Sequence, residues 1–109
     1  MEKGPSTYAQ YRISENSEVK HFKDHGKQMG FNKIIDYSRA AVEFANAERQ
    51  SIISFTANEK KYNSTYKYDK DTNEFMIISK DGKIVTYFPP TDGIEYFYTQ
   101  FEKWGDYWI

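Results

Sequence analysis

The two histidines of the chain, His21 and His25, are the side chains best suited to proton transfer near neutral pH. They lie four residues apart in a segment predicted to be helical, so both imidazoles are expected on one helical face, one turn apart. Lys23 lies between them, and the chain contains no cysteine. This arrangement indicates acid–base chemistry, although two solvated histidines on a surface helix would show the same pattern.

The histidine spacing is also that of the two-histidine zinc helix of metalloproteases. In that motif a glutamate general base follows the first histidine, whereas this chain has Phe22 there. The metalloprotease interpretation therefore fails. A two-histidine metal site completed by a distant carboxylate stays open, but we expect neither a metal nor any other cofactor.

A second group of candidate residues follows the tight turn predicted at residues 81–82, on a strand predicted at 83–88. With the histidines, this strand supplies what cleavage of RNA through the ribose 2′-OH requires. A base removes the 2′ proton, an acid protonates the leaving 5′ oxygen, and a cation or hydroxyl stabilises the phosphorane. Alternation puts Lys83 and Tyr87 on one strand face and Thr86 on the other. Lys83 and Thr86 can share a site only at a sheet edge, at a bulge, or through the lysine's reach.

Two helices are predicted before residue 50 to position the histidines. The first begins at residue 16 or 17, where Ser17 can cap it, and ends near Gly30. The second begins at Asn32 and ends near Ala47, because apolar and small side chains recur there with helical period. Its predicted buried face consists of Ile34, Ile35, Ser38, Ala41, Val42 and Ala45.

After residue 50 the pattern changes to β-branched and aromatic residues separated by turns. We predict strands at 51–57, 62–68, 74–79, 83–88 and 94–100, with turns at 69–73 and 81–82. The fold class is therefore α+β, with two N-terminal helices packed on one face of a twisted antiparallel sheet of four or five strands. Residues 1–14 are expected to be a lead-in segment and residues 15–109 a single domain.

Composition narrows the classes of function. The 109 residues suit one domain, and ten Tyr, eight Phe and two Trp can build its core. The net charge of −1 gives no global basic field that would favour nucleic-acid binding. No apolar run is long enough to span a bilayer, so no membrane segment is expected. The absence of cysteine excludes disulfides and thiolate metal sites.

Four motifs together resemble a known family. They are His21-Phe-x-x-His25-Gly26, Phe44-Ala45-Asn46, Tyr66-x-Tyr68-Asp69 followed by Thr72-Asn73-Glu74-Phe75, and Lys80-Asp81-Gly82-Lys83-Ile84-x-Thr86-Tyr87-Phe88-x-Pro90. Over most of residues 17–98 the chain resembles C-terminal toxin domains of the barnase, EndoU, colicin D and RelE-like (BECR) superfamily of metal-independent ribonucleases. The negative net charge differs from the positive net charge of many such nucleases.

The resemblance implies a toxin of contact-dependent growth inhibition or a related system. It implies helices that precede a four- or five-stranded antiparallel sheet, and an RNA substrate, often the anticodon region of a transfer RNA. A cognate immunity protein would neutralise the enzyme. The domain would be secreted or delivered by an effector system and would act in the cytoplasm of a target bacterium.

The same resemblance assigns roles to residues. His21 would be the general acid–base, with His25 as the second candidate. Lys83 would contact the scissile phosphate, and Thr86 would donate a hydrogen bond to it. Substrate binding would fall to Lys23, Lys80, Tyr87 and Tyr96, although packing is the alternative role for both tyrosines.

A non-enzymatic binding module is the alternative function. Tyr and Trp are enriched in the hot spots of protein interfaces, and the C-terminal stretch is rich in both. An immunity-like protein, an adaptor or a structural phage domain would use that aromatic surface to contact a partner.

Overall fold

The computed structural model describes residue 20 and residues 22–57 and 63–108. Its elements in chain order are η1 (Phe22–Gly26), α3 (Ile34–Asn46), β1 (Ile52–Ala57), β2 (Thr65–Asp69), β3 (Glu74–Ile78), β4 (Ile84–Phe88), α4 (Ile94–Trp104) and β5 (Gly105–Trp108). No helix in these ranges has the length and apolar character needed to cross a membrane.

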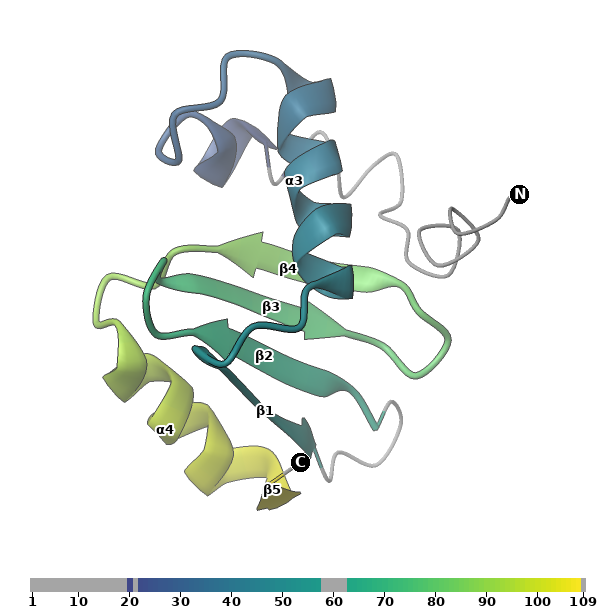
Figure 1. Ribbon diagram of the computed structural model, residues 1–109, viewed down its shortest axis with the longest axis vertical. Helices are drawn as coiled ribbons and strands as arrows, with labels where there is room; N and C mark the ends of the chain where they lie inside the picture. The colour runs from purple at the N-terminus through teal and green to yellow at the C-terminus, as the bar shows by residue number, and fades with distance from the viewer. Residues whose placement is uncertain (1–19, 21, 58–62, 109) are drawn as a thin grey trace.

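A single antiparallel sheet organises the fold (Figure 1). Its strand order is β4-β3-β2-β1-β5, so the first four strands form a meander and the C-terminal strand adds to the β1 edge. The α+β class and the antiparallel sheet predicted from the sequence are confirmed. The four predicted strands between residues 51 and 88 are also confirmed, with shifts of one to three residues at their ends.

Helix α3 packs over strands β3 and β4 on one face of the sheet. Its buried residues are Tyr37, Ala41, Phe44 and Ala45. The predicted helix is confirmed, but its predicted buried face was partly wrong, since Ile35 is 57 % exposed. The aromatic rings determine which stripe faces the sheet, because each buries more apolar area than an isoleucine.

The last predicted strand, residues 94–100, is wrong, because these residues belong to helix α4. Ile94, Phe97 and Phe101 recur at helical spacing, and all three pack against the sheet face opposite α3. Gly93, with φ of 61°, begins the helix in a conformation that favours glycine. The prediction that the helices cover one sheet face is therefore also wrong: α3 and α4 cover opposite faces.

The predicted helix at residues 17–30 is only partly described. Within it the structure has the single π-helical turn η1, which ends at the buried Gly26. The ring of Phe22 lies where a Cβ on Gly26 would be, 2.3 Å from the ring's Cδ1, so only glycine permits this close approach. The predicted helix end near Gly30 is wrong, because the helical turn ends at Gly26 and residues 27–30 form a turn in which Gly30 has φ of 89°. His21 and the proposed lead-in segment, residues 1–14, lie outside the described residues.

The motif at residues 68–74 forms the turn between β2 and β3. The Asp69 carboxylate accepts hydrogen bonds from the backbone N–H groups of Asp71 and Thr72, and Asn73 adopts φ of 62°. The Asn73 amide then donates to the carbonyl of Pro90, at the far end of β4. These residues of the family resemblance thus connect the meander to the segment that leads into α4.

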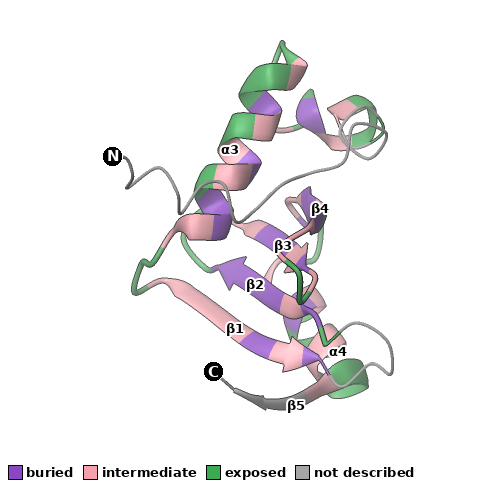
Figure 2. Cartoon of the chain, turned by 90° about the vertical axis from the view of Figure 1, so that its right-hand side faces the viewer, coloured by how far each residue is buried: buried purple, intermediate pink, exposed green. Residues whose placement is uncertain are grey.

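The face of the sheet that carries α3 is only partly covered. Helix α3 lies over β3 and β4, whereas the side chains of Ser54, Thr56 and Thr65 on β1 and β2 are half-buried and lie beyond the helix. In Figure 2 strand β1 is mostly of intermediate burial, whereas β2 is mostly buried. The uncovered half forms the floor of a groove.

Candidate functional site

His25 is the catalytic candidate that the structure describes in the N-terminal half. Its ring stacks on the ring of Phe88, with 4.9 Å between centroids and 24° between planes. Because η1 packs against both α3 and β4, it brings this imidazole to the end of the edge strand β4. The half-buried ring keeps contact with solvent while its orientation is restricted.

Of the strand candidates, Thr86 is nearer to His25 than Lys83 is. Thr86 lies two residues before Phe88 on the same strand face, which corresponds to about 7 Å along the strand. Lys83 lies five residues before Phe88, or about 16 Å away, and its backbone N–H donates to Ser79 Oγ at the hairpin. His25 therefore lies at the end of β4, with Thr86 the nearer of the two candidates along the strand and Lys83 the more distant.

The tyrosine candidates belong to the packing of the two faces. Tyr87 is 1 % exposed in the α3 core and donates a hydrogen bond to Glu74 Oε2, and burial, with that bond, raises its pKa above the usual range. A stacking contact between Tyr87 and RNA is therefore incompatible with its burial. Tyr96 is half-buried against Phe75 and Phe88, and burial raises its pKa.

The two lysines assigned to substrate binding lie apart from one another. Lys23 is exposed on η1. Lys80 is exposed in the β3–β4 hairpin, on the rim of the groove. The four substrate-binding candidates are thus distributed over the η1 surface, two cores and the groove, and only Lys80 contributes to the cavity described next.

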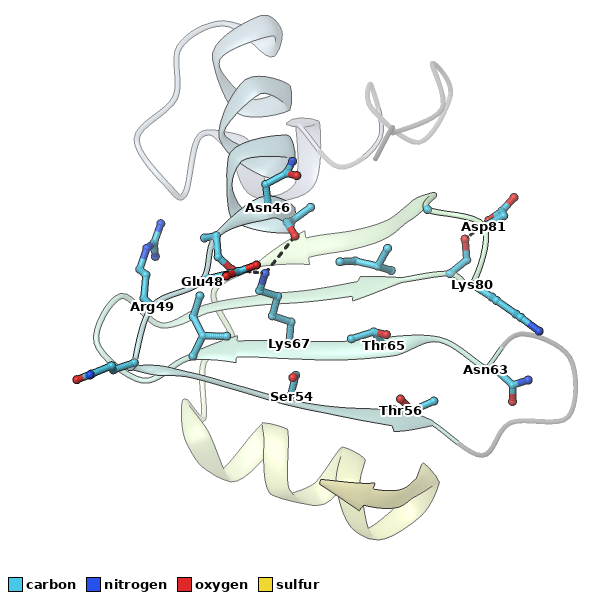
Figure 3. Close-up of a pocket in the computed structure, with 17 residues that line it drawn as sticks. Asn46, Glu48, Arg49, Ser54, Thr56, Asn63, Thr65, Lys67, Lys80 and Asp81 are labelled. Atoms are coloured by element: carbon cyan, nitrogen blue, oxygen red, sulfur yellow. Dashed lines mark hydrogen bonds between the residues drawn. The ribbon is translucent and has the colours of Figure 1, made fainter. Parts of the chain in front are cut away.

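The groove has a volume of about 1230 Å³ and lies beside the C-terminal end of α3 (Figure 3). Its floor consists of two adjacent cross-strand pairs of β1 and β2, Ser54 with Lys67 and Thr56 with Thr65. The segment at 45–50 and the hairpin at 79–82 form its walls. None of the described residues that line it is aromatic, and its charged members are Arg49, Lys67, Lys80, Glu48 and Asp81.

Lys67 places a buried ammonium group at the floor of this groove. Its side chain rises from β2, is 9 % exposed, and donates hydrogen bonds to the carbonyls of Ala45 at 3.1 Å and Ala47 at 2.7 Å. The ammonium also lies 5.3 Å from the centroid of the Phe44 ring. Burial lowers the pKa of Lys67, and the charge of Arg49 acts in the same direction.

The partners of Lys67 in the described part of the chain are two backbone carbonyls and an aromatic ring, all formally neutral. Among the described residues, no carboxylate oxygen lies within 4.0 Å of its ammonium, although Glu48 and Glu74 act on it at longer range. The carbonyls it binds belong to the end of α3, where the helix dipole favours a cation and the last turn of α3 supplies none. Lys67 therefore closes the end of α3 and also presents positive charge to the groove.

Asn46 adds an unsatisfied acceptor to the groove wall. Its Nδ2 donates to the Val42 carbonyl, 2.9 Å away, whereas its buried Oδ1 has no hydrogen-bond partner among the described residues. A buried polar atom without a partner costs about 1–3 kcal/mol.

The sequence contained a signal for the groove that our predictions did not use. Ser54 and Thr56 alternate with Ile53 and Phe55, and Thr65 and Lys67 alternate in the same way with aromatic residues. Such alternation indicates a sheet with one polar face. The sequence did not indicate which part of that polar face α3 would leave uncovered.

The described residues contain no group of three or more His, Asp or Glu side chains placed to hold a metal ion. The open alternative of a two-histidine site involves His21 and so extends beyond the described residues.

Comparison of the chain with protein-family models gives no match, and no curated protein sequence matches it.

Proposed function

We propose that this protein is a metal-independent endoribonuclease, a toxin domain that cleaves RNA, with transfer RNA as the expected substrate. The observation that carries the proposal is the stacking of His25 on Phe88, which brings a proton-transfer group to the strand that carries Thr86. The resemblance to BECR ribonuclease toxins, which rests on the histidine segment and this hairpin, supports the same function.

The proposed reaction transfers two protons and exchanges one P–O bond for another. A general base takes the proton of the ribose 2′-OH, and O2′ forms a bond to phosphorus. The bond from phosphorus to O5′ breaks, and a general acid protonates O5′. The products are a 2′,3′-cyclic phosphate and a 5′-OH end. His21 and His25 are the candidate base and acid, and the Thr86 hydroxyl would stabilise charge on the phosphorane.

Lys83 has a modified role in this proposal. Because it lies just before β4, about 16 Å from Phe88, we assign it to a neighbouring phosphate of the RNA instead of the scissile one. Lys23 would contribute attraction for the RNA from the exposed side of η1.

The test compares three substitutions in purified protein incubated with transfer RNA in EDTA. His25→Ala removes both the proton-transfer group and the ring stacked on Phe88, whereas His25→Phe keeps an aromatic ring there. If His25 transfers a proton, both variants should lose about 100-fold or more in cleavage rate. Gln28→Ala, at an exposed position of the same segment, should retain activity. Full activity of His25→Phe would remove His25 from the mechanism.

His21 is tested by the same assay, with His21→Ala and the double variant of both histidines. If the two histidines act as a base–acid pair, the double variant should cleave RNA only slightly more slowly than the slower of the two single variants, because the pair acts as a unit. Folding is checked by the circular dichroism and thermal melting of every variant. A cleavage rate that no substitution changes would contradict the assignment of both histidines.

The biological role follows from the same proposal. A ribonuclease toxin would be delivered by an effector system into the cytoplasm of a target bacterium and neutralised by a cognate immunity protein in the producer. Expression in a bacterium without that protein should stop growth, and His25→Phe should relieve the effect. Growth unaffected by wild-type protein present at normal levels would count against a toxin.

A protein-binding module is the second candidate, and one observation favours it. Tyr98 and Trp104 of α4 are each 42 % exposed, and exposed aromatic side chains are frequent at interfaces. A binding module should be tolerated on expression and should leave transfer RNA intact, so the growth and cleavage assays separate the two functions.

A further inference from the structure

We infer that the groove beside the C-terminal end of α3 binds the phosphate backbone of a single-stranded RNA segment through Ser54, Thr56, Thr65 and Lys67. This inference rests on the proposed ribonuclease function and identifies the surface that would hold the substrate away from His25. The groove and η1 lie at opposite ends of α3, whose 13 residues span about 20 Å.

The charge at the groove floor favours an anion. Lys67 is about nine-tenths buried, and its hydrogen-bond partners are two backbone carbonyls. An ammonium has three N–H donors, so one remains beyond these two bonds. Buried charges are normally paired, because leaving water without a counter-charge is costly. A phosphate oxygen in the groove would supply the opposite charge that the described partners of Lys67 do not.

The hydroxyl groups of the floor suit the same ligand. Ser54 lies opposite Lys67 and Thr56 opposite Thr65, so the four side chains start from a four-cornered array of positions on adjacent strands. The Lys67 ammonium rises from this array to the carbonyls of Ala45 and Ala47. Cross-strand neighbours in such pairs are about 5 Å apart, and neighbours along a strand about 7 Å. Figure 3 shows the four side chains on the sheet below the end of α3. Hydroxyls and cations are the usual donors to nucleic-acid phosphates.

The composition of the groove favours RNA over an acidic protein. The hot spots of protein interfaces are enriched in Tyr and Trp, whereas none of the described groove residues is aromatic. The groove residues therefore offer no aromatic ring for base stacking, and the hydroxyl and ammonium contacts would position the backbone without reading the bases.

Lys67→Met is the principal test, because it keeps an unbranched chain and removes the charge. Lys70→Met is the matched control, since Lys70 is exposed in the β2–β3 turn and does not line the groove. The probe is a fluorescein-labelled single-stranded RNA of about ten nucleotides, and its Kd is measured by anisotropy at several salt concentrations. Both histidines are replaced by alanine in every variant so that the probe stays intact.

Loss of one phosphate contact has two measurable consequences. Lys67→Met should raise the Kd about tenfold and reduce the slope of log Kd against log salt by about 0.7. A residue that only closes the helix end would not change the salt slope. Thr65→Val should raise the Kd and leave the slope unchanged, because the threonine is neutral. Since Thr65→Val does not involve the helix end, it tests the groove even where Lys67→Met lowers stability.

Cleavage kinetics in the background with both histidines provide an independent readout. A contact remote from the reacting phosphate binds the ground state and transition state equally, so Lys67→Met should raise KM with kcat unchanged. If the wild-type protein cleaves RNA and the groove variants show unchanged Kd, KM and salt slope, the groove inference would be overturned, while the proposed ribonuclease function would stand. Failure of wild-type protein to bind or cleave any RNA would overturn both proposals. Loss of affinity for an acidic protein partner alone would assign the groove to that partner instead.

Discussion

Strand β2 carries two buried charges on one face, Asp69 and Lys67, and their surroundings differ. Asp69 is completely buried and accepts a hydrogen bond from Arg49 at 2.7 Å as well as those from the turn backbone. Lys67 has neutral protein partners and faces the groove. We therefore assign Asp69 to stability and Lys67 to binding, and each assignment is open to a separate measurement.

The pKa of Asp69 leads to a prediction about acid stability. Burial alone would raise that pKa, but hydrogen bonds from Arg49, the turn backbone and Ser51 outweigh it and hold the pKa below its usual value. The unfolded chain therefore takes up a proton at higher pH than the folded one. Asp69 should add stability above about pH 4 that is lost as the pH falls through the folded-state pKa.

Substitution of Asp69 isolates the contribution of its carboxylate to stability. Asp69→Asn should lower the free energy of unfolding at pH 7 by about 2–3 kcal/mol, because a buried charge-assisted hydrogen bond is lost. Its stability should also depend less on pH between about 5 and 2 than that of the wild type. Asp71→Asn, exposed in the same turn, is the control. Urea unfolding at several pH values measures both effects, and equal slopes for Asp69→Asn and wild type would refute the assignment.

Among the elements, α4 is where sequence and structure differ most. Aromatic and β-branched residues at 94–100 favour a strand locally, yet packing decides otherwise, since Phe97 of α4 meets Phe55 and Tyr68 on the sheet. The helical spacing of Ile94 and Phe101 was visible in the sequence but competed with strand propensity. Strands β1 to β4 and helix α3 were predictable because their periodicity and their turn residues agreed.

The importance of α4 is tested by removing its central contact. Phe97 is fully buried, with its ring centroid 5.2 Å from that of Phe55. Phe97→Ala should destabilise the protein by about 3–5 kcal/mol through lost burial and the cavity left behind. Tyr98→Ala, at the exposed neighbour, should change stability by less than about 1 kcal/mol. Thermal or urea unfolding distinguishes them, and similar effects for the two variants would place residue 97 outside the core.

The candidate site was predictable only in part, because it depends on contacts between distant segments. The sequence identified His25 and Thr86 as candidates but could not show that η1 would bring the imidazole onto Phe88. The sequence also could not show that Lys83 lies far from His25, because that separation depends on which end of β4 the turn η1 packs against. The groove was not predicted, because its floor shows only the ordinary polar–apolar alternation of two strands. The position of α3 determines which part of that polar face stays accessible.

At the scale of the whole molecule, the sheet is covered unequally on its two faces. Helix α4 packs on an aromatic face, while α3 covers part of the opposite face and leaves the hydroxyl-lined groove beyond its end. His25 lies at the β4 edge and the groove over β1 and β2. A flexible polyanion such as RNA can contact two such separated regions at once, whereas a small substrate cannot.

The nature of the RNA ends tests the central claim most directly. Purified protein is incubated with transfer RNA in EDTA, and the fragment ends are identified by mass spectrometry. The account predicts 2′,3′-cyclic phosphate and 5′-OH ends, produced at an undiminished rate in EDTA and lost in His25→Phe. Uncleaved RNA, or fragments with 3′-OH ends that require a divalent metal, would contradict it.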